Sequence, residues 1–415
     1  MAELDSALLE GKSITVIVSG GIAAYKICEL VRGLIKAGAD VKVAMTEHAA
    51  AFVGPMTFEA LTGHPAALTE WPRDPRADGP MPHIDLARCD LMIVAPATAN
   101  LLAKAANGIA DDLASTLILA RRGPTVFMPA MNMHMWANPA TQRNAAALRA
   151  SGCVFIGPAE GFQACGDVGA GRMTEPAEAL DLLKGFFAPK RLAGRRVLVT
   201  AGGTFEAIDP VRGITNRSSG RQGIEIARAA RDAGADVTLV AGLVSVPMPA
   251  GIRVIAVETA QQMHDAVMTT LDAGGVDVFL GVAAVADWRP REASREKIKK
   301  AADGRPGLTD IEWIENPDIL AAVAKRGSVK CVAGFAAESA QGELLAERAQ
   351  DKLRRKGADF IVANDARAAL GAKDNVVRIL TPEGEERAFG PADKAACARF
   401  IIGAAADLLE QKEAH

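Results

Sequence analysis

The stretch RVLVTAGGTFEAIDPVRGITNRSSG, residues 196–220, decides the fold that this sequence predicts. It opens with an apolar, β-rich run at 197–200, continues through the pair Gly202 and Gly203, and ends in Ser-Ser-Gly, where a helix can begin. A strand, a tight turn and a helix N-terminus in this order present free backbone N–H groups to an anion. Residues 14–26, ITVIVSGGIAAYK, repeat the pattern. A chain that starts an α/β sheet twice is expected to carry two nucleotide-type sites.

Length and composition favour a globular protein of more than one domain. At 415 residues the chain exceeds one ordinary core, and 49% apolar with 23% charged residues is a globular balance. Aromatic residues make up only 4%, which argues against stacking surfaces for single-stranded nucleic acid. The net charge of −3 gives no electrostatic reason to expect DNA, RNA or an acidic membrane as partner.

The cysteines and the N-terminal residues lead us to expect a cytoplasmic protein. The six cysteines form no CxxC pair, so neither a disulfide framework nor a zinc site is indicated. The first residues, MAELDSALLEGK, lack the basic start and apolar core of a signal peptide. No uncharged apolar run reaches the roughly 18 residues that a membrane-spanning helix needs.

Short apolar runs alternate with helical stretches along both halves. In the first half we expect strands at 14–19, 40–46, 91–95, 125–128 and 153–156, and helices at 22–37, 99–106, 113–121, 141–150 and 177–187. In the second half we expect strands at 197–200, 236–240, 253–257, 276–282, 330–334 and 359–363, helices at 220–233, 260–272, 317–326 and 343–356, a hairpin of 376–380 with 386–389, and a last helix at 393–409. This alternation predicts mainly parallel sheets, with ligands beyond the carboxyl ends of the strands.

Two further segments are expected to lack regular structure. Residues 161–176, GFQACGDVGAGRMTEP, hold four glycines and no helical or strand period. Residues 188–194, APKRLAG, are expected to link the two domains.

The first glycine turn is weak evidence for a phosphate site, because glycine is common at any strand-to-helix turn. It lacks the full G-x-G-x-x-G spacing, and Thr46 rather than an acid follows the second strand, which argues against an NAD-type site. The hydroxyls of Thr46 and Thr98 suit a phosphate, but each residue also suits a helix N-cap.

Three residues of the first half are candidates for catalysis. Cys165 lies in the glycine-rich stretch, where an accessible thiol suits a proton donor or nucleophile. His83 is either a structural histidine or a general base. Asn132 either caps a turn or binds a substrate carboxylate.

In the second half, the basic run RPREASREKIKK at 289–300 follows an apolar segment that ends at Asp287. Such a run is commonly a solvated face, but a basic loop also suits a lid over a triphosphate. Asn316 and Asp318 fit an Asx-type helix cap, which alone is structural.

Taken together, the segments resemble two known enzyme families. The first half resembles the FMN-dependent cysteine decarboxylases in SGGIAAYK (19–26), PATAN (96–100), GIADDL (108–113), PAMNMHMW (129–136) and QACGDVGAGRM (163–173). The second half resembles phosphopantothenate–cysteine ligase in DPVRGITNRSSG (209–220), AAVADWRP (283–290), EKIKK (296–300), NPDI (316–319) and GFAAE (334–338). In this order, the motifs are similar to the bacterial bifunctional enzymes of coenzyme A biosynthesis, in which the two activities are fused.

For the first half, the resemblance implies an FMN-dependent phosphopantothenoylcysteine decarboxylase. The residues implied to bind FMN are Gly20, Gly21, Ile22, Thr46 and Thr98, the last two near its phosphate. The implied catalytic residues are His83, Asn132 as the ligand of the departing carboxylate, and Cys165 as the proton donor.

For the second half, the resemblance implies activation of phosphopantothenate by CTP and Mg²⁺ as an acyl-cytidylate, which the amine of cysteine then attacks. Asn216 would hold the acyl-cytidylate, Arg212 would serve the amide-forming step, and Lys297 would belong to a lid. The other positions implied to bind the nucleotide are Gly281, Ala283, Asp287, Asn316, Pro317, Asp318, Ile319, Phe335, Lys352 and Lys356. The metal ligands are not indicated.

We therefore expect an α/β protein of two Rossmann-like domains with mainly parallel sheets. Residues 1–189 are expected to form a flavodoxin-like FMN decarboxylase and residues 190–415 a nucleotide-binding ligase. The resemblance also implies a homo-oligomer, with decarboxylase trimers and ligase dimers, acting on small molecules. Two alternatives remain open: a flavoprotein that decarboxylates peptidyl-cysteine, and a regulatory subunit of the same fold without catalysis.

Overall fold

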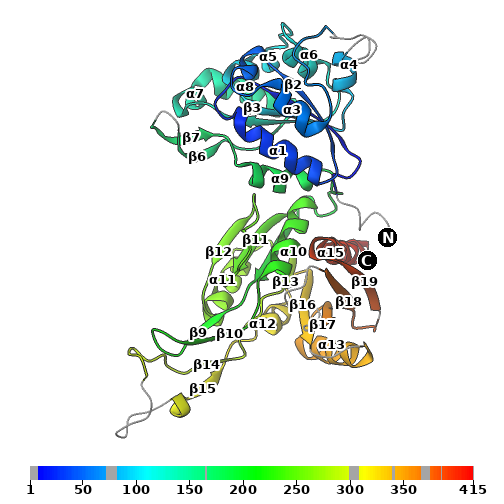
Figure 1. The fold of residues 1–415 in the computed structure, drawn as a ribbon. Helices are drawn as coiled ribbons and strands as arrows, with labels where there is room; N and C mark the ends of the chain where they lie inside the picture. The colour runs from blue at the N-terminus through cyan, green and yellow to red at the C-terminus, as the bar shows by residue number, and fades with distance from the viewer. Residues whose placement is uncertain are drawn as a thin grey trace. The chain divides into compact units, whose positions relative to one another are not determined.

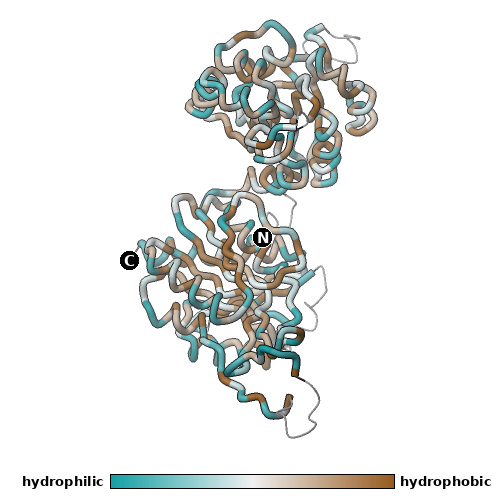
Figure 2. Tube along the Cα trace, turned by 90° about the vertical axis from the view of Figure 1, so that its left-hand side faces the viewer, coloured by the Kyte–Doolittle hydropathy of each residue, from teal (hydrophilic) through white to brown (hydrophobic). Residues whose placement is uncertain are grey.

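The computed structural model describes residues 8–71, 82–163, 166–298, 308–338, 342–365, 374–384 and 386–414. The chain divides into two compact units, Ser6–Phe187 and Ala188–His415, each with its own sheet (Figure 1). In Figure 2, hydrophobic stretches run through the inside of each unit. No helix in these ranges is both long and apolar enough to span a membrane.

The first unit is built on a parallel sheet with the strand order β2-β1-β3-β4-β5. Its strands are β1 (Ser13–Val18), β2 (Asp40–Met45), β3 (Leu91–Ala97), β4 (Thr125–Pro129) and β5 (Val154–Phe155). This is the flavodoxin-like order, in which the direction of winding reverses between β1 and β3. The carboxyl ends of these two strands therefore mark the expected ligand site of the unit.

Helices cover both faces of this sheet, because successive strand residues point to opposite sides. Val16 of β1 packs in a cluster with α1, α3 and α9, while Ile17 packs in a second cluster with α5, α6 and α8. The helices are α1 (Ala24–Lys36), α2 (Glu47–Ala50), α3 (Pro55–Thr62), α4 (Pro82–Ala87), α5 (Ala99–Asn107), α6 (Leu113–Ala120), α7 (Met133–Ala137), α8 (Pro139–Ala150) and α9 (Pro176–Lys184).

The second unit has a sheet with the order β12-β11-β8-β13-β16-β17-β18-β19. It is parallel from β12 to β17, and β18 and β19 add antiparallel to its edge. Its strands are β8 (Arg196–Ala201), β11 (Asp236–Ala241), β12 (Arg253–Ala256), β13 (Val278–Gly281), β16 (Cys331–Glu338), β17 (Phe360–Asp365), β18 (Asp374–Leu380) and β19 (Glu386–Asp393). The parallel part has the Rossmann order, with its reversal between β8 and β13.

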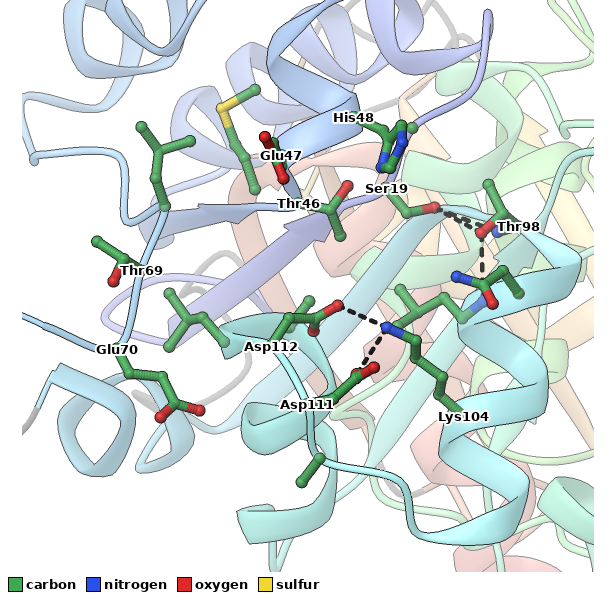
Figure 3. Close-up of a pocket in the computed structure, with 18 of the residues that line it drawn as sticks. Ser19, Thr46, Glu47, His48, Thr69, Glu70, Thr98, Lys104, Asp111 and Asp112 are labelled. Carbon is green, nitrogen blue, oxygen red and sulfur yellow. Dashed lines mark hydrogen bonds and ion pairs between the residues drawn. The ribbon is translucent and has the colours of Figure 1, made fainter.

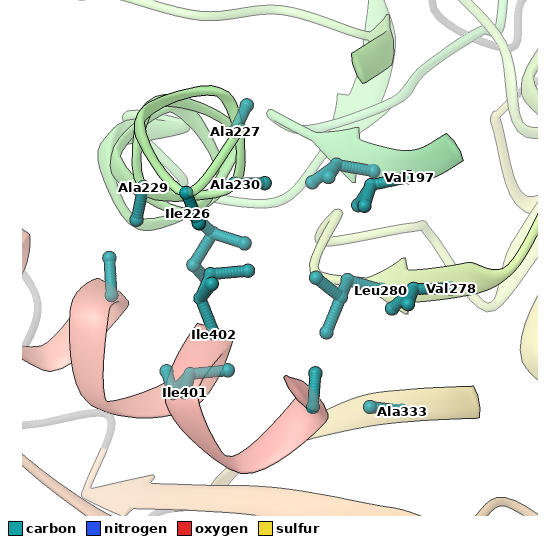
Figure 4. Close-up of a cluster of buried hydrophobic side chains, with 14 of the residues drawn as sticks. Val197, Ile226, Ala227, Ala229, Ala230, Val278, Leu280, Ala333, Ile401 and Ile402 are labelled. Carbon is teal, nitrogen blue, oxygen red and sulfur yellow. The ribbon is translucent and has the colours of Figure 1, made fainter. Parts of the chain in front are cut away.

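The core of the second unit also lies on both faces of its sheet. Helices α10 (Arg221–Asp232) and α15 (Lys394–Ala414) cover one face, where Ile226, Ala230 and Ile402 meet Leu280 of the sheet (Figure 4). Helices α11 (Ala260–Asp272), α12 (Ile319–Arg326) and α13 (Gly342–Lys356) cover the other face. A Cβ added at Gly223 of α10 would lie 2.5 Å from the Cβ of Ala201, so α10 approaches β8 more closely than a side chain permits.

Short antiparallel ladders extend from both units. Strands β6 (Ala159–Phe162) and β7 (Val168–Arg172) form a hairpin in the first unit. In the second unit β9 (Phe205–Ala207) pairs with β10 (Gly213–Thr215), and β14 (Trp288–Pro290) with β15 (Trp313–Glu315). The expectation that residues 161–176 lack strands is therefore wrong: the backbone pairs across the hairpin although glycines interrupt the side-chain alternation.

Candidate active sites

A cleft of about 730 Å³ opens at the carboxyl ends of β1, β2 and β3, where the winding of the first unit reverses (Figure 3). Ser19, Thr46 and Thr98 each follow one of these strands and line the cleft. The other described residues that line it are Gly20, Met45, Glu47, His48, Leu68, Thr69, Glu70, Trp71, Asn100, Leu101, Lys104, Ala110, Asp111, Asp112, Leu113 and Ala114. The position agrees with the expectation for a flavodoxin-like sheet.

The hydroxyl residues of this cleft cap the helices that begin there. Thr46 Oγ1 accepts from the N–H of Ala49 at 3.2 Å, and Thr98 Oγ1 accepts from the N–H of Leu101 at 3.3 Å. The N–H of Thr98 donates to Ser19 Oγ at 3.2 Å, which ties the ends of β1 and β3 together. The N-cap interpretation of both threonines is correct, and it leaves them on the cleft wall at helix N-termini that favour an anion.

The glycine turn after β1 has no room for a side chain at its first position. A Cβ added at Gly20 would lie 2.3 Å from the Cβ of His48 and 3.0 Å from its carbonyl carbon. A Cβ at Gly21 would lie 3.7 Å from Thr98 Cγ2, an ordinary contact. Ile22 follows with 62% of its surface exposed.

Acidic side chains outnumber basic ones in the described lining of the first cleft, which holds Glu47, Glu70, Asp111 and Asp112 against Lys104 and His48. Lys104 Nζ lies 2.6 Å from Asp111 and 2.9 Å from Asp112 (Figure 3). Hydrogen bonds to Asp111 and then to Asp112 raise the pKa of Lys104 above its usual value. Because the charge of this lysine is already compensated, a phosphate in the cleft would depend on neutral hydroxyls and backbone N–H groups.

Asn132 links helix α7 to the β6–β7 hairpin. Its Oδ1 accepts from the N–H of His134 at 2.8 Å, which caps α7, and its Nδ2 donates to Asp167 Oδ2 at 2.7 Å. Asn132 thus caps a turn, as one sequence interpretation held, and it also fixes the position of the hairpin.

Backbone contacts hold this hairpin against the start of α7. The N–H of Met133 donates to Gln163 Oε1 at 3.0 Å, and the N–H of Met131 donates to Gly171 O at 2.9 Å. A Cβ at Gly171 would lie 2.4 Å from Met131 O, so only glycine permits this approach. Cys165, which follows Gln163 by two positions, lies outside the described residues.

His83 lies on α4, which packs on α6. The Oγ1 of Thr15 donates to Leu86 O at 2.7 Å and anchors this helix to β1. The Nδ1 of His83 is buried and has no hydrogen-bond partner within the described ranges. Among the described residues that line the first cleft, neither His83 nor Asn132 occurs. Of the positions expected to bind FMN, the described lining contains Gly20, Thr46 and Thr98 but not Gly21 or Ile22. The structure therefore groups three of these five positions and leaves His83 and Asn132 outside that group.

A second cleft, of about 480 Å³, lies at the carboxyl ends of β8, β13 and β16, where the second sheet reverses. The described residues that line it are Thr200, Phe279, Gly281, Ala283, Val285, Ala286, Asp287, Trp288, Glu315, Asn316, Pro317, Asp318, Ile319, Leu320, Phe335, Lys352, Arg355 and Lys356. Every position expected to bind the nucleotide is in this set except Lys297, which is exposed.

Hydrogen bonds to backbone groups shape this cleft. Thr200 Oγ1 accepts from the N–H of Ala283 at 3.2 Å. The N–H of Asn316 donates to Asp287 O at 2.8 Å, and its Nδ2 donates to Ala286 O at 2.7 Å. The segment that follows β13 is thereby joined to the segment that precedes α12.

The basic residues of the second cleft come from α13. Lys356 pairs with Asp318, the N-cap of α12, and Lys352 Nζ donates to Phe335 O at 2.7 Å. Burial alone would raise the pKa of Asp318, but the hydrogen bonds from Lys356 and from the N–H of Ala321 outweigh it and lower the pKa below its usual value. Asp318 therefore stays ionised at neutral pH and retains Lys356 at the cleft.

Asn216 lies beside the segment that follows β13. Its Nδ2 donates to Ala284 O at 3.2 Å and to Val285 O at 3.0 Å. Val285 itself lines the second cleft, whereas Asn216 is not among the described residues that line it.

Arg212 is held by a buried carboxylate. Asp209 accepts from Arg212 Nε at 2.9 Å and from the N–H of Ile298 at 3.2 Å, and the guanidinium also donates to Ile298 O at 2.6 Å. The Arg212 guanidinium, with the backbone N–H groups of Val211, Ile298 and Arg212 itself, lowers the pKa of Asp209 well below its usual range in spite of burial. This cluster fixes the segment next to Lys297.

The glycine pair after β8 differs from the expectation. The N–H of Gly203 donates to Leu243 O at 3.0 Å and is not free for an anion. Gly202 has φ +83°, and a Cβ there would lie 2.5 Å from Leu243 O, so this turn packs against the chain that follows β11. Its glycines serve close packing.

Among the described residues, no cluster of three or more His, Cys, Asp or Glu side chains is arranged to hold a metal ion.

Sequence reasoning missed some residues of both clefts. Ser19 and Thr200 were missed although their position at the end of a strand is a usable signal. Lys104, Glu315 and Arg355 had no such signal, because only the packing of distant segments brings them to a cleft.

The first unit is flavodoxin-like and the second is Rossmann-like. Each has a cleft at its switch point, the place where the strand order of its sheet reverses. The chain is therefore a two-domain α/β protein with a candidate ligand site in each domain. Family models agree: residues 4–188 match the Flavoprotein family, and residues 192–408 match the DNA/pantothenate metabolism flavoprotein C-terminal domain.

The chain is 47% identical to the coenzyme A biosynthesis bifunctional protein CoaBC of Vibrio cholerae over 91% of this chain and 94% of that one. It is 44% identical to CoaBC of Escherichia coli K12 over 91% of this chain and 93% of that one. A crystal structure of the C-terminal domain of CoaBC is 36% identical, with a TM-score of 0.45, and matches 54% of this chain and 99% of that one.

The chain belongs to the CoaBC family of bifunctional coenzyme A biosynthesis proteins. The resemblance, the α/β fold class and the bifunctional lyase and ligase function expected from the sequence are thereby confirmed.

Proposed function

We propose that residues 1–189 form the FMN-dependent phosphopantothenoylcysteine decarboxylase of this enzyme, and that residues 190–415 form its CTP-dependent phosphopantothenate–cysteine ligase. The observation that carries this proposal is that each unit has its own cleft at the switch point of its own sheet. Membership of the CoaBC family supports the pairing of the two activities.

The residues of the first cleft fit an FMN group. The volume of about 730 Å³ is in the range of cofactor pockets, and Gly20 lines the cleft at a turn that has no room for a side chain. We assign Gly20, Gly21 and Ile22 to contact with the flavin. We assign Thr46 and Thr98 to its phosphate end, where two helix N-termini supply N–H donors.

When bound, FMN supplies the two-electron oxidation and reduction that make loss of the substrate carboxylate feasible. The chain supplies orientation and protons. Asn132 is assigned to the carboxylate of the cysteinyl group, with its amide oriented by Asp167. Cys165 is assigned the role of proton donor and His83 that of general acid or base.

In the ligase half, the carboxylate of phosphopantothenate attacks the α-phosphorus of CTP and releases pyrophosphate. The amine of cysteine then attacks the acyl carbon and releases CMP. We assign Asn216 to the acyl-cytidylate, Arg212 to the second step and Lys297 to a lid. The remaining nucleotide contacts belong to the residues named for the second cleft. Mg²⁺ would accompany the triphosphate, since this ion is usually held by one or two carboxylates together with the phosphates of the nucleotide.

We also propose that the enzyme works in the cytoplasm as a homo-oligomer, with trimers of the decarboxylase half and dimers of the ligase half. The position of His83 and Asn132 outside the first cleft is consistent with a site that a second copy completes.

The experiment that tests the proposed function is mass-spectrometric product analysis of the full chain with phosphopantothenate, cysteine, CTP, Mg²⁺ and FMN. We expect phosphopantetheine only when all are present, and phosphopantothenoylcysteine when FMN alone is removed. Formation of the cysteine adduct without any nucleotide would contradict the ligase assignment.

A further inference from the structure

The second cleft contains a basic residue to which no role has been given. Arg355 lies in the last turn of α13 and lines the cleft together with Lys352 and Lys356. The spacing of i, i+3 and i+4 places these three residues on one face of the helix. The adjacent Arg354 is not among the described lining residues and instead pairs with Asp351 at 2.7 Å.

The three cations differ in how far their charge is already compensated. Lys356 pairs with the carboxylate of Asp318, and Lys352 donates to the carbonyl of Phe335. Within the part of the chain that the structure describes, the guanidinium of Arg355 makes no hydrogen bond or ion pair. An anion that enters the cleft can therefore bind Arg355 without displacing another protein group from its guanidinium.

Arg355 determines whether the charges that line the second cleft balance. The acidic side chains among the described lining residues are Asp287, Glu315 and Asp318, and the basic ones are Lys352, Arg355 and Lys356. Without Arg355, acids would outnumber bases on the walls of a site that has to accept a polyphosphate. Arginine also offers a planar fork that bonds two phosphate oxygens at once.

We propose that Arg355 binds the polyphosphate of the nucleotide directly and thereby distinguishes a nucleoside triphosphate from a nucleoside. This inference rests on the proposed nucleotide function of the second cleft. Lys352 and Lys356 bind from the same face, and Arg355 adds the charge that balances the three carboxylates of the described lining when these remain ionised.

The test compares two adjacent arginines of the full chain by isothermal titration with CTP and with cytidine. We expect Arg355→Gln to raise the Kd for CTP by about tenfold and to leave the affinity for cytidine unchanged. The matched control Arg354→Gln removes the same charge one position away and is expected to change both affinities by less than about twofold. The affinity of the Arg355→Gln variant for CTP is also expected to fall less steeply with added salt.

Three results would overturn the assignment. An unchanged Kd for CTP in Arg355→Gln, alongside normal binding by the unsubstituted chain, would remove Arg355 from the site and leave the nucleotide site intact. Equal weakening for CTP and cytidine would indicate a general distortion of the cleft. An unsubstituted chain that binds no CTP would overturn the proposed function and this inference together.

Discussion

At the scale of single residues, Gly20 is a position of the first cleft that leaves no room for a side chain. A Cβ there would lie 2.3 Å from His48 Cβ and 3.0 Å from the carbonyl carbon of His48, and rotation of the His48 side chain moves neither of these atoms. We predict that Gly20→Ala weakens FMN binding by about tenfold, because overpacking of this size costs about 1–3 kcal/mol. The flavin absorbance per purified chain measures the effect.

The matched control for this substitution is Gly54→Ala. Gly54 has φ −65°, and no described atom lies within 4 Å of the position of its added Cβ. Flavin content in this variant is expected to equal that of the unsubstituted chain. Full flavin content in Gly20→Ala would show that the flavin does not contact this turn.

Asn216 gives a residue-scale prediction for the second unit. Its Nδ2 donates to the carbonyl oxygens of Ala284 and Val285, and an aspartate carboxylate would face both of these oxygens without a hydrogen to donate. We predict that Asn216→Asp lowers the rate of CTP-dependent ligation by roughly a hundredfold. The decarboxylation of added phosphopantothenoylcysteine is the internal control. A ligation rate equal to that of the unsubstituted chain would reject the assignment of Asn216.

At this scale the sequence allowed much of the second site to be anticipated, and less of the first. The positions expected around the nucleotide lie in motifs at strand ends, and parallel strands bring such ends to one edge. Arg355 escaped prediction because its neighbour Arg354 is chemically identical and only the rotation of α13 distinguishes them. The clustering of Lys104 with Asp111 and Asp112 depends on the packing of α5 against α6, which no local pattern specifies.

At the scale of elements, the loop from β9 to β10 is clamped by Asp209. This carboxylate accepts from the N–H groups of Val211, Arg212 and Ile298 and from the guanidinium of Arg212. The pKa of Asp209 in the folded chain is depressed, so its ionisation stabilises the fold above the unfolded pKa of about 3.9. That stabilisation is lost as the pH falls below this value and through the lower pKa of the folded chain.

We therefore predict that Asp209→Asn lowers the Tm of the second unit by about 3 °C or more at pH 7, with a difference that shrinks below about pH 4. Differential scanning calorimetry from pH 7 to pH 3 measures both. Asp351→Asn is the control: this aspartate is 74% exposed in its pair with Arg354, and its loss should leave Tm unchanged. A difference of the same size at pH 3 would mean that the ionisation of Asp209 does not stabilise the loop.

The elements that the sequence predicted well are those with a long, buried pattern. Helix α11 begins and ends at the expected residues. Its start is well defined because Thr259 forms a capping box with Gln262. The strands of both parallel sheets lie within a few residues of their expected ranges because they are apolar on both faces. The ladders β9–β10 and β14–β15 escaped prediction because strands of three residues are too short to show a period.

The hairpin β6–β7 escaped prediction for a different reason. Gly161 and Gly171 have φ values of 146° and 150°, and the pairing shifts register between Ala159 and Glu160. Glycines without side chains leave no alternation of apolar and polar residues to recognise.

At the scale of the whole molecule, the chain consists of two units that each bury their own core. We predict that residues 1–189 and 190–415, expressed separately, each fold and keep one partial reaction, since a unit of this size can support its own core. Flavin absorbance of the first piece and CTP-dependent ligation by the second measure this. If the second piece ligated only when mixed with the first, the assignment of the whole ligase site to residues 190–415 would be wrong.

The account depends most on the separation of the flavin site from the nucleotide site. Titration of the full chain with FMN and CTP, alone and together, tests it directly. The account predicts one FMN and one CTP bound per chain, with neither ligand changing the amount of the other that is bound. Displacement of FMN by CTP, or of CTP by FMN, would contradict it.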